Sequence, residues 1–588
     1  MAIRVLLACA AFASRVAASP YWVRGRARAP RAAPPRRPTH PAPRPRPRPP
    51  QDYVHADDGA FAWRDTGKIL HSDSVLAENA WTGYLLNVTS QKWLTPADFS
   101  GPIGHIWTHQ VLVIVPNRTR YADAAAMWIT GNDNNGAPDE LPSATDEDVL
   151  VCASLAVTVG TVCTVLFQIP NAPIVFAADP LQKARSEDAL VAFTWSQYML
   201  HDRARPEWVA YFPMGKAAIK TMDATTAFVS QLRGGPPLSR WVTAGASKRG
   251  ATTWFTGAAA DPRIIGIIPV VFDVLSFRAG VQHMWQTLGN WTFAFTDYRD
   301  MNVTLYLNDG SDNLDVLAAQ MDPLAYKENL TMAKIIVDAT GDEFFQPQDD
   351  DFWWGQLPGE TLRIMADNAE HSFATGALYL VTAAEAWFKM LLDGTPRPTF
   401  SWTIANDTGA ITVTTTGEQP VAVVNRMTTT LDGYRRDFRL VAGNTPANPC
   451  TVGIPVPVFG SACLKPILWI GNTIGPASTV GDVQTWVATQ DPPLVGWRAW
   501  LVELYYNSTT PGLLQQYTTQ VAVRWVAAYA LTNPYLSTSA DSLTPSHPPL
   551  KKSVPPGGQH AAVPIPSLQG RRVHRRSGVR RSPFIFKQ

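Results

Sequence analysis

Short apolar runs alternate with segments of helical spacing between residues 52 and 394, and this alternation restricts the fold more than any other feature of the sequence. Successive strands with a helix-length crossover between them pair in parallel. We expect strands at 110–116, 126–131, 161–168, 241–244, 264–272, 333–339 and 361–366. We expect helices at 145–158, 187–200, 215–232, 251–260 and 376–392. The sequence therefore predicts an α/β domain with a mostly parallel sheet and flanking helices over residues 52–394.

A different pattern begins at residue 397. Runs of β-branched and aromatic residues, separated by turn residues, continue to about residue 533, as in ITVTTT (411–416) and WRAWLVELYY (497–506). Residues of these types are enriched in strands, and short strands with frequent turns are typical of a β-sandwich. We therefore expect a small β-sandwich domain over residues 397–535, directly after the α/β domain.

The charges are distributed unevenly along this chain, whose formal net charge is +2. Residues 1–51 contain eleven arginines and no acid, and residues 542–588 contain nine basic residues and no acid. The part between them carries a net of about 18 negative charges, which argues against nucleic acid binding by the folded body. The Pro- and Arg-rich composition predicts a disordered linker over 20–51 and a disordered basic tail over 540–588. No apolar run has the length of a membrane span.

The amino terminus has the features of a secretion signal. Arg4 precedes the apolar run 5–13, and the small residues at 16–18 suit cleavage, so we expect a signal peptide over 1–19. An organellar transit peptide is the alternative, because the next thirty residues are rich in Arg and Pro and contain no acid. Secretion is favoured by seven glycosylation sequons, at Asn87, Asn117, Asn290, Asn302, Asn329, Asn406 and Asn507.

Cysteine spacing also favours an oxidising compartment. Loss of the leader would remove Cys9 and leave four cysteines in two local pairs, Cys152 with Cys163 and Cys450 with Cys463. The alternative is four free thiols in the core. The sequence contains no CxxC or His-rich spacing for zinc and no Rossmann or P-loop glycine pattern, so we expect neither a metal nor a cofactor.

Ser247 lies between a predicted strand and a predicted helix, within GASKRG (245–250). A sharp strand-to-helix turn needs small neighbours, and it directs the serine hydroxyl above the sheet, at the positive end of the next helix. Such a nucleophile elbow is typical of α/β-hydrolases. The sequence therefore predicts that Ser247 is a catalytic nucleophile.

Two further groups follow later strands of the predicted sheet. Asp342 follows the strand at 333–339, and His371 follows the strand at 361–366. The chain order is serine, acid, histidine, which is the order of α/β-hydrolases. We expect His371 to accept the proton of Ser247, and Asp342 to orient the imidazole and stabilise its cation.

Several neighbours compete for these roles or explain the residues differently. Asp338, Glu343 and the acidic run 349–351 lie close to Asp342 in the sequence and are alternatives for the acid. Asp273 ends the strand at 264–272, where a carboxylate can simply cap a loop. His371 itself could be a core histidine that only makes structural hydrogen bonds.

The oxyanion of the reaction would need two N–H donors. The first is the backbone N–H of Lys248, the residue after the nucleophile. The second is predicted in the turn-rich loop at Gly131 and Asn132, because the loop after the strand at 126–131 has the place of that donor in such folds.

Many separated segments of the chain resemble one known family, the PhoPQ-activated pathogenicity-related family, also called autocrine proliferation repressor-like. The resemblance is carried by ITGNDN, FQIPNAPIVF, RSEDALVAFTW, FPMGKAAIKTMDA, GASKRG, IPVVFDVLSF, DATGDEFFQPQD, LPGETLRIMADNAEHS and RRDFRL. These matches extend over roughly residues 52–530. The resemblance implies an α/β-hydrolase domain followed by a β domain.

The family motifs correspond to the same three residues. The serine of GASKRG is Ser247, the aspartate of GDEFF is Asp342, and the histidine of NAEHS is His371. The chain departs from the family pattern, which has Trp, Gln and Gly respectively, at three positions: Ala251, Ala172 and Asn132.

The resulting hypothesis is a secreted serine hydrolase that cleaves an ester or peptide bond of a small substrate through an acyl-enzyme. The alternative is a secreted signalling or binding protein that keeps the fold, has weak or no catalysis, and acts on a receptor or another protein partner. The family includes a proliferation repressor as well as virulence-associated members, so the resemblance allows both.

Overall fold

The computed structural model describes residues 50–525, except 73, 75, 137–138, 374, 432, 444–452 and 457–459. The predicted signal peptide at 1–19, nearly all of the linker at 20–51, and the tail at 540–588 lie outside the described residues. Cys450 also lies outside them.

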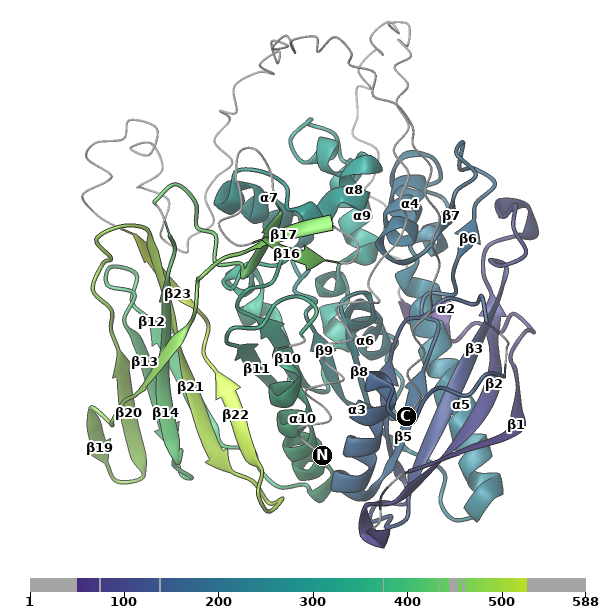
Figure 1. Cartoon of the computed structure of the whole chain (residues 1–588), viewed down its shortest axis with the longest axis horizontal. Coiled ribbons are helices and arrows are strands. Elements are labelled where there is room, and N and C mark those ends of the chain that lie inside the picture. The colour runs from purple at the N-terminus through teal and green to yellow at the C-terminus, as the bar shows by residue number, and fades with distance from the viewer. Residues whose placement is uncertain are drawn as a thin grey trace, which may run out of the picture. The chain divides into compact units, whose positions relative to one another are not determined.

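A nine-stranded sheet forms the centre of the α/β part (Figure 1). Its strands, in spatial order, are β1 (Ala62–His71), β2 (Trp81–Lys92), β3 (Ile106–Pro116), β5 (Val162–Leu166), β4 (Ala124–Ile129), β8 (Arg240–Ala246), β9 (Ile264–Val270), β10 (Ala333–Ala339) and β11 (Thr361–Ala366). The six strands from β5 to β11 in this order pair in parallel, and β1, β2 and β3 are antiparallel. Strand β5 lies between β3 and β4 in the sheet, so these strands are not in sequence order. This exchange and the parallel strands that follow confirm the predicted α/β-hydrolase fold.

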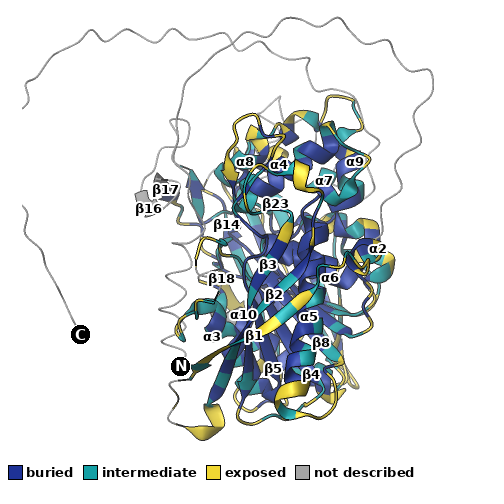
Figure 2. Ribbon diagram, turned by 90° about the vertical axis from the view of Figure 1, so that its right-hand side faces the viewer, coloured by how far each residue is buried: buried dark blue, intermediate teal, exposed yellow. Residues whose placement is uncertain are grey.

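Helices cover both faces of this sheet. The sheet-covering helices are α3 (Glu147–Leu155), α5 (Tyr211–Arg233), α6 (Lys248–Ala258) and α10 (Ala377–Asp393). Strand β3 shows why two layers form: Val111 and Val113 pack with the apolar residues of α5 and α6, whereas Leu112 and Ile114 pack with those of α3 and α10. Successive side chains of a strand point to opposite faces, so a continuous apolar run requires cover on both. Figure 2 shows the strands buried between these layers.

A helical insertion lies between β9 and β10 in the sequence. It contains α7 (Phe277–Leu288), α8 (Thr296–Asp300) and α9 (Asn313–Met321), and α8 and α9 contact α4 (Glu187–Leu200). Because β8, β9 and β10 are parallel, the loops after all three strands emerge at one edge of the sheet. The insertion is one of these connections, and Figure 1 shows its helices beyond that edge.

The residues after α10 form antiparallel sheets, as predicted. One sheet contains β12 (Thr399–Ile404), β13 (Ile411–Thr416), β20 (Val483–Ala488) and β19 (Ser478–Val480). A second contains β18 (Ile470–Thr473), β14 (Ala422–Thr429), β21 (Trp497–Asn507), β22 (Leu514–Thr518) and β23 (Ala522–Trp525). Val413 of the first sheet and Leu504 of the second belong to one hydrophobic cluster, which continues into the layer of α3 and α10 on the central sheet. A third sheet contains β15 (Val441–Gly443), β17 (Gly460–Leu464) and β16 (Gly453–Val456).

The sandwich is bonded to the sheet edge that ends at β11. The side-chain Oγ1 of Thr518 in β22 accepts a hydrogen bond of 3.0 Å from the backbone N–H of Met365 in β11. Just beyond β11, the Asn368 side chain donates to the carbonyl of Trp469 at 2.9 Å and accepts from the N–H of Trp469 at 2.8 Å. The edge strand and the loop after it are therefore supported by residues of the sandwich region.

One predicted disulfide is present. Cys152 of α3 is bonded to Cys163 of β5, which links a helix to the strand beneath it. Cys463 of β17 is also disulfide-bonded. Its predicted partner, Cys450, is outside the described residues, so that pairing stays a prediction.

Two strands of the nine-stranded sheet, β1 and β2, were not predicted from the sequence. Strand β1 carries polar residues and is exposed along much of its length, and β2 alternates buried and half-buried residues over only part of its length. Their pairing extends the sheet beyond β3. None of the described helices is both long enough and apolar enough to cross a membrane.

Candidate active site

Ser247 occupies a sharp turn between β8 and α6. Its backbone φ is 58° and its ψ is −122°, a region that side-chain-bearing residues rarely adopt. A Cβ atom at Gly245 would lie 2.8 Å from the Cβ of Arg249, and one at Gly250 would lie 2.7 Å from the carbonyl oxygen of Val270. The glycines of GASKRG are therefore required because backbone and side chains approach closely on both sides of the serine.

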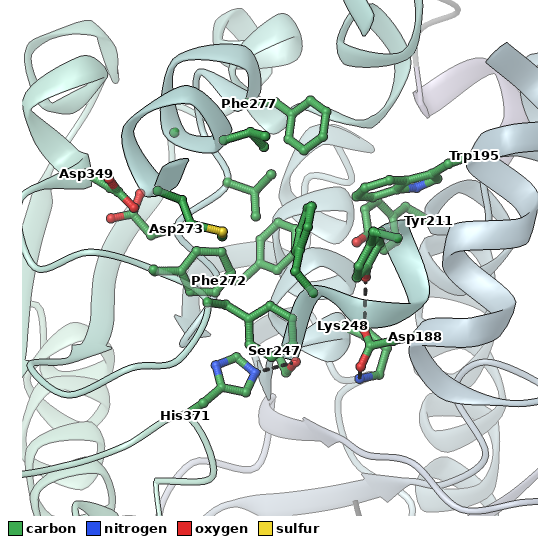
Figure 3. Close-up of a pocket in the computed structure, with 18 residues that line it drawn as sticks. Asp188, Trp195, Tyr211, Ser247, Lys248, Phe272, Asp273, Phe277, Asp349 and His371 are labelled. Carbon is green, nitrogen blue, oxygen red and sulfur yellow. Dashed lines mark hydrogen bonds and ion pairs between the residues drawn. The ribbon is translucent and has the colours of Figure 1, made fainter. Parts of the chain in front are cut away.

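The three predicted residues come together above the ends of β8, β10 and β11. Nε2 of His371 lies 2.9 Å from Oγ of Ser247, and Nδ1 of His371 lies 2.8 Å from Oδ2 of Asp342. Figure 3 shows the imidazole directed at the serine hydroxyl. This chain of hydrogen bonds has the order that proton transfer from serine to histidine requires.

Asp342 is itself fixed by backbone groups. Its Oδ1 accepts hydrogen bonds from the N–H groups of Phe344 at 2.6 Å and Phe345 at 3.1 Å. These bonds leave Oδ2 directed at His371. Backbone N–H groups of the turn after β10 therefore hold one oxygen of the carboxylate, and the other bonds to His371.

The competing acids have other partners. Glu343 accepts a hydrogen bond of 2.9 Å from the backbone N–H of His371, and burial together with the charge of Asp342 raises the pKa of Glu343 to about 8. Asp338 lies 3.9 Å from the buried guanidinium of Arg363, and Asp349 lies 2.5 Å from Nδ1 of His283. Among the described acids, Asp342 is the one that accepts a hydrogen bond from the ring of His371.

The histidine is tuned toward its protonated form. Burial lowers the pKa of His371, but the charge of Asp342, its hydrogen bond and the nearby Glu343 together outweigh burial, so the pKa is raised above 6.5. The ring packs against Phe344, with 4.4 Å between the ring centroids. A base of this kind is neutral, and able to accept a proton, only above its raised pKa.

A largely apolar pocket opens at Ser247 and His371 (Figure 3). Eight aromatic residues line it: Trp195, Tyr211, Phe272, Phe277, Phe295, Tyr298, Phe344 and Phe345. Three carboxyl groups also line it, those of Asp188, Asp273 and Asp349. Residues of α4 and of the insertion helices α7 and α8 form part of these walls. The arrangement can hold an apolar group next to an activated hydroxyl.

Within the described residues, no group of three or more His, Cys, Asp or Glu side chains is arranged to hold a metal ion.

Comparison with known proteins identifies the family. The family model described as PhoPQ-activated pathogenicity-related protein matches residues 51–439. The chain belongs to this family. It is also 33% identical over 487 residues to the Autocrine proliferation repressor protein A of Dictyostelium discoideum, a match that covers 80% of this chain and 89% of that protein.

Among solved structures, the chain is similar to an acetyl xylan esterase from Paenibacillus sp. R4, with 13% identity and a TM-score of 0.37. That match covers 57% of this chain and 92% of the esterase. It is also similar to the closed state of Candida antarctica lipase A, with 12% identity and a TM-score of 0.33, covering 60% of this chain and 88% of the lipase.

The residues that depart from the family pattern lie in different surroundings. Ala251 is buried in α6, one turn after the serine, and Ala172 is buried near the loop that follows β5. Asn132 has a φ of 93°, a backbone conformation that suits the glycine of the family pattern.

In this family member, the predicted oxyanion donors are not equivalent. Lys248 is the first residue of α6, so its N–H has no acceptor within the helix and lies next to Ser247. Gly131 and Asn132 are absent from the described residues that line the pocket. The Gly131 carbonyl accepts from the Gln168 N–H, and a Cβ at Gly131 would lie 2.8 Å from Cζ of Arg249. The role of this loop therefore stays a prediction.

Sequence reasoning missed a charged network behind the serine. The Lys248 ammonium lies 2.9 Å from Asp188 and 3.2 Å from Glu187, and the Arg249 guanidinium forms a bidentate pair with Glu187. Burial raises the pKa of Glu187, but the two cations outweigh it and lower the pKa to about 2. The pairs connect α6 to the beginning of α4 and direct Arg249 away from the pocket. Two adjacent cations in GASKRG and two adjacent acids in RSED were the available signal.

Proposed function

We propose that this protein is a secreted serine hydrolase that cleaves an ester or peptide bond through an acyl-enzyme. The observation that carries the proposal is the continuous hydrogen-bonded chain from Ser247 through His371 to Asp342. It stands at a strained strand-to-helix turn, beside an apolar pocket. Strained backbone conformations of this kind are retained mostly where function needs them.

The reaction follows from the positions of the three side chains. As Oγ of Ser247 bonds to the substrate carbonyl carbon, its proton moves to Nε2 of His371, and Asp342 stabilises the imidazolium. The bond to the leaving group then breaks, and the leaving group takes the proton from Nε2. A water molecule attacks the acyl-enzyme, gives its proton to Nε2, and releases Ser247 with that proton restored to Oγ.

Negative charge develops on the carbonyl oxygen when Ser247 attacks. The N–H of Lys248, at the amino terminus of the eleven-residue helix α6, is suited to stabilise that charge. The helix dipole adds to the effect of this single donor. The second donor would come from another backbone group beside the serine, for which the loop at Gly131 and Asn132 is the predicted source.

A fluorophosphonate probe tests the proposal, because phosphonylation uses the same nucleophile, base and oxyanion donors. We expect covalent labelling at Ser247, identified by peptide mass spectrometry. Ser247→Ala should abolish the label and leave the unfolding temperature nearly unchanged, since one hydroxyl is lost. Labelling of another serine, or none in the folded wild-type protein at any pH, would exclude the proposed mechanism.

A second candidate function is signalling by a secreted protein with weak or no catalysis. The name of the Dictyostelium relative, a proliferation repressor, supports it, and that relative matches most of this chain. Under this reading, a receptor or another protein partner would bind the fold. Wild-type protein that folds but resists the probe would favour this function.

Secretion is supported by the disulfide of Cys152 with Cys163 and by the exposure of many sequons. The sequon residues Asn117, Asn290, Asn302, Asn406 and Asn507 are exposed and open to glycosylation. Asn329 differs, because its amide donates hydrogen bonds to Gln51 and to the carbonyl of Ala258. We expect glycans on the exposed sites and none on Asn329, which glycopeptide mass spectrometry of the secreted protein would check.

A further inference from the structure

Asp273 is a buried carboxyl group in the wall of the pocket that also contains Ser247. It follows strand β9 and is only 3% exposed. The indole N–H of Trp353 donates a hydrogen bond to its Oδ1. No hydrogen bond to Oδ2 is present among the described residues, so one oxygen is held and the other is available to the pocket.

The other two carboxyl groups of the pocket are already occupied. Asp188 accepts from the Lys248 ammonium at 2.9 Å and from the Tyr298 hydroxyl at 2.9 Å. Asp349 accepts from Nδ1 of His283 at 2.5 Å and from the Gln346 N–H at 2.8 Å. Asp273 is therefore the pocket carboxyl that keeps one oxygen without a hydrogen-bond partner among the described residues.

The surroundings of Asp273 decide its protonation. Burial is the first cause that raises its pKa well above the usual value, and the charges of Asp338 on β10 and of Asp349 and Asp350 on the short helix at 349–352 raise it further. The guanidinium of Arg363 on β11 opposes them in part. Burial and the neighbouring carboxyl groups therefore favour the protonated, neutral form of Asp273. Because Oδ1 accepts from Trp353, the proton belongs on Oδ2, where it can be donated into the pocket.

The geometry of the reaction tells which part of a substrate reaches Asp273. The leaving group must lie beside His371, which protonates it, so the remaining space of the pocket is left for the acyl group. Its walls are mainly aromatic and aliphatic. An acyl group that fills them meets Oδ2 of Asp273, which has no hydrogen-bond partner among the described residues. Leaving a buried donor unpaired costs about 1–3 kcal/mol.

We propose that Asp273 determines acyl specificity by donating a hydrogen bond from Oδ2 to an uncharged oxygen of the acyl group. The inference rests on the proposed hydrolase function and narrows its substrate class. The substrate is an ester or amide whose acyl group is largely apolar and carries an ether, hydroxyl or carbonyl oxygen beyond the scissile bond. Substrates that lack this oxygen leave the buried donor unpaired and are disfavoured.

The test uses 4-nitrophenyl esters in matched pairs. One member of each pair has an ether oxygen at the third, fourth or fifth atom of an aryl-terminated acyl chain, and the other has CH2 there. The preference is kcat/KM for the ether ester divided by kcat/KM for the CH2 ester of the same pair. Dividing the preference of a variant by that of the wild type cancels the difference in intrinsic reactivity between the two esters. We expect Asp273→Leu to reduce the preference for one ether about tenfold, which corresponds to one lost hydrogen bond.

Asp273→Asn separates a neutral donor from a charged carboxylate. The amide can accept from Trp353 and donate an N–H into the pocket, so we expect the preference to stay within about threefold of the wild type. A loss as large as that of Asp273→Leu would show that a carboxylate holding a cation is required and would overturn the proposal. Unchanged preferences in both variants would overturn it as well.

The pH dependence gives a second readout. The wild-type preference should fall as pH rises through the raised pKa of Asp273, because the donated proton is lost, whereas Asp273→Asn should show no such fall. Asp338→Asn is the matched control: Asp338 is buried in the same acidic cluster but is not among the residues that line the pocket. It should keep the preference at low pH and lose it at a lower pH than the wild type, because one charge that raises the pKa of Asp273 is removed.

Fluorophosphonate labelling of Ser247 separates the two proposals. If the wild-type protein and the variants are labelled but no ester pair is distinguished, the acyl-group inference fails and the hydrolase function stands. If the folded wild-type protein is not labelled, both fail. Thermal unfolding of each variant excludes loss of the fold as the cause.

Discussion

The serine and the histidine of the candidate site are held in different ways. Ser247 follows β8, which pairs with β4 on one side and β9 on the other, and its turn is enclosed by Gly245 and Gly250. His371 follows β11, which ends the sheet, and Asn368 in its loop bonds to Trp469, a hundred and one residues later. The serine is positioned by its own segment and adjacent strands, whereas the histidine depends on the sandwich region. The sequence around Ser247 therefore indicates how the serine is held, whereas the sequence around His371 does not indicate how the histidine is held.

The largest expected effect comes from breaking the hydrogen bond through which His371 acts on Ser247. His371→Ala should slow fluorophosphonate labelling of Ser247 by about a thousandfold or more, because the hydroxyl loses its general base. Asp342→Asn should be slowed less, since the imidazole remains. Time courses of labelling with intact-protein mass spectrometry measure both. Equal labelling of His371→Ala and the wild type would show that the hydrogen bond between His371 and Ser247 has no catalytic role.

A single added carbon tests how closely the serine side is packed. Gly250→Ala places a Cβ 2.7 Å from both the Cβ of Phe272 and the carbonyl oxygen of Val270, so backbone must move. We expect a loss of about 3 kcal/mol in the free energy of unfolding, measured by denaturant titration. Gly280→Ala in α7 is the control: a Cβ there would have no atom within 4 Å, and helix propensity favours alanine by about 1 kcal/mol. Equal stability of the two variants would contradict the packing argument.

The histidine side should respond to a distant contact. Asn368 has a φ of 58°, which glycine tolerates, so Asn368→Gly removes the two hydrogen bonds to Trp469 without adding backbone strain. We expect labelling to slow about tenfold and the free energy of unfolding to decrease by about 1–2 kcal/mol. Asn302→Gly, compared in protein without N-linked glycans, is the control, because Asn302 is exposed and has a φ of 63°. Labelling at the wild-type rate in Asn368→Gly would show that the loop holds the histidine without the sandwich region.

The smallest expected effect is a shift along the pH axis. Labelling should rise with pH as His371 loses its proton, with a midpoint above 6.5, because Asp342 raises the pKa of His371. The same raised pKa stabilises the folded state below pH 6.5, and this contribution disappears as pH rises through the folded-state value. Asp342→Asn should lower the midpoint. A midpoint at or below 6.5 in the wild type would contradict the electrostatic argument.

The sequence was sufficient for the architecture because the parallel strands, and most of the antiparallel strand β3, are buried on both faces. Runs such as QVLVIVP and TVCTVLFQ have no polar face, so their lengths and the helices between them indicate the sheet directly. Strand β1 lacks this signal because most of its residues are exposed. Helix α5 begins at Tyr211, four residues before the predicted start. The earlier start is possible because Pro213 is tolerated in the first turn of a helix.

For the candidate site, the sequence indicated which strand ends carry chemistry but not how their groups pair. Ser247, Asp342 and His371 were found because parallel strands bring their carboxyl ends to one edge. The choice of Asp342 over Glu343 depends on which oxygen the turn N–H groups hold, and adjacent residues in a sequence do not reveal that. The pairing of Lys248 and Arg249 with α4 depends on tertiary packing of segments about sixty residues apart.

The bonds between Asn368 and Trp469 also limit how this protein can be divided. The family model ends at residue 439, which suggests that position as the end of a shortened protein. Such a fragment would lack Trp469 and Thr518, and with them the outside support of the edge strand and of the histidine loop. The sandwich region is thus not an optional appendage of the α/β domain. Replacing or shortening the carboxy-terminal sheets, in protein engineering or in evolution, would also change the contacts that hold the loop of His371.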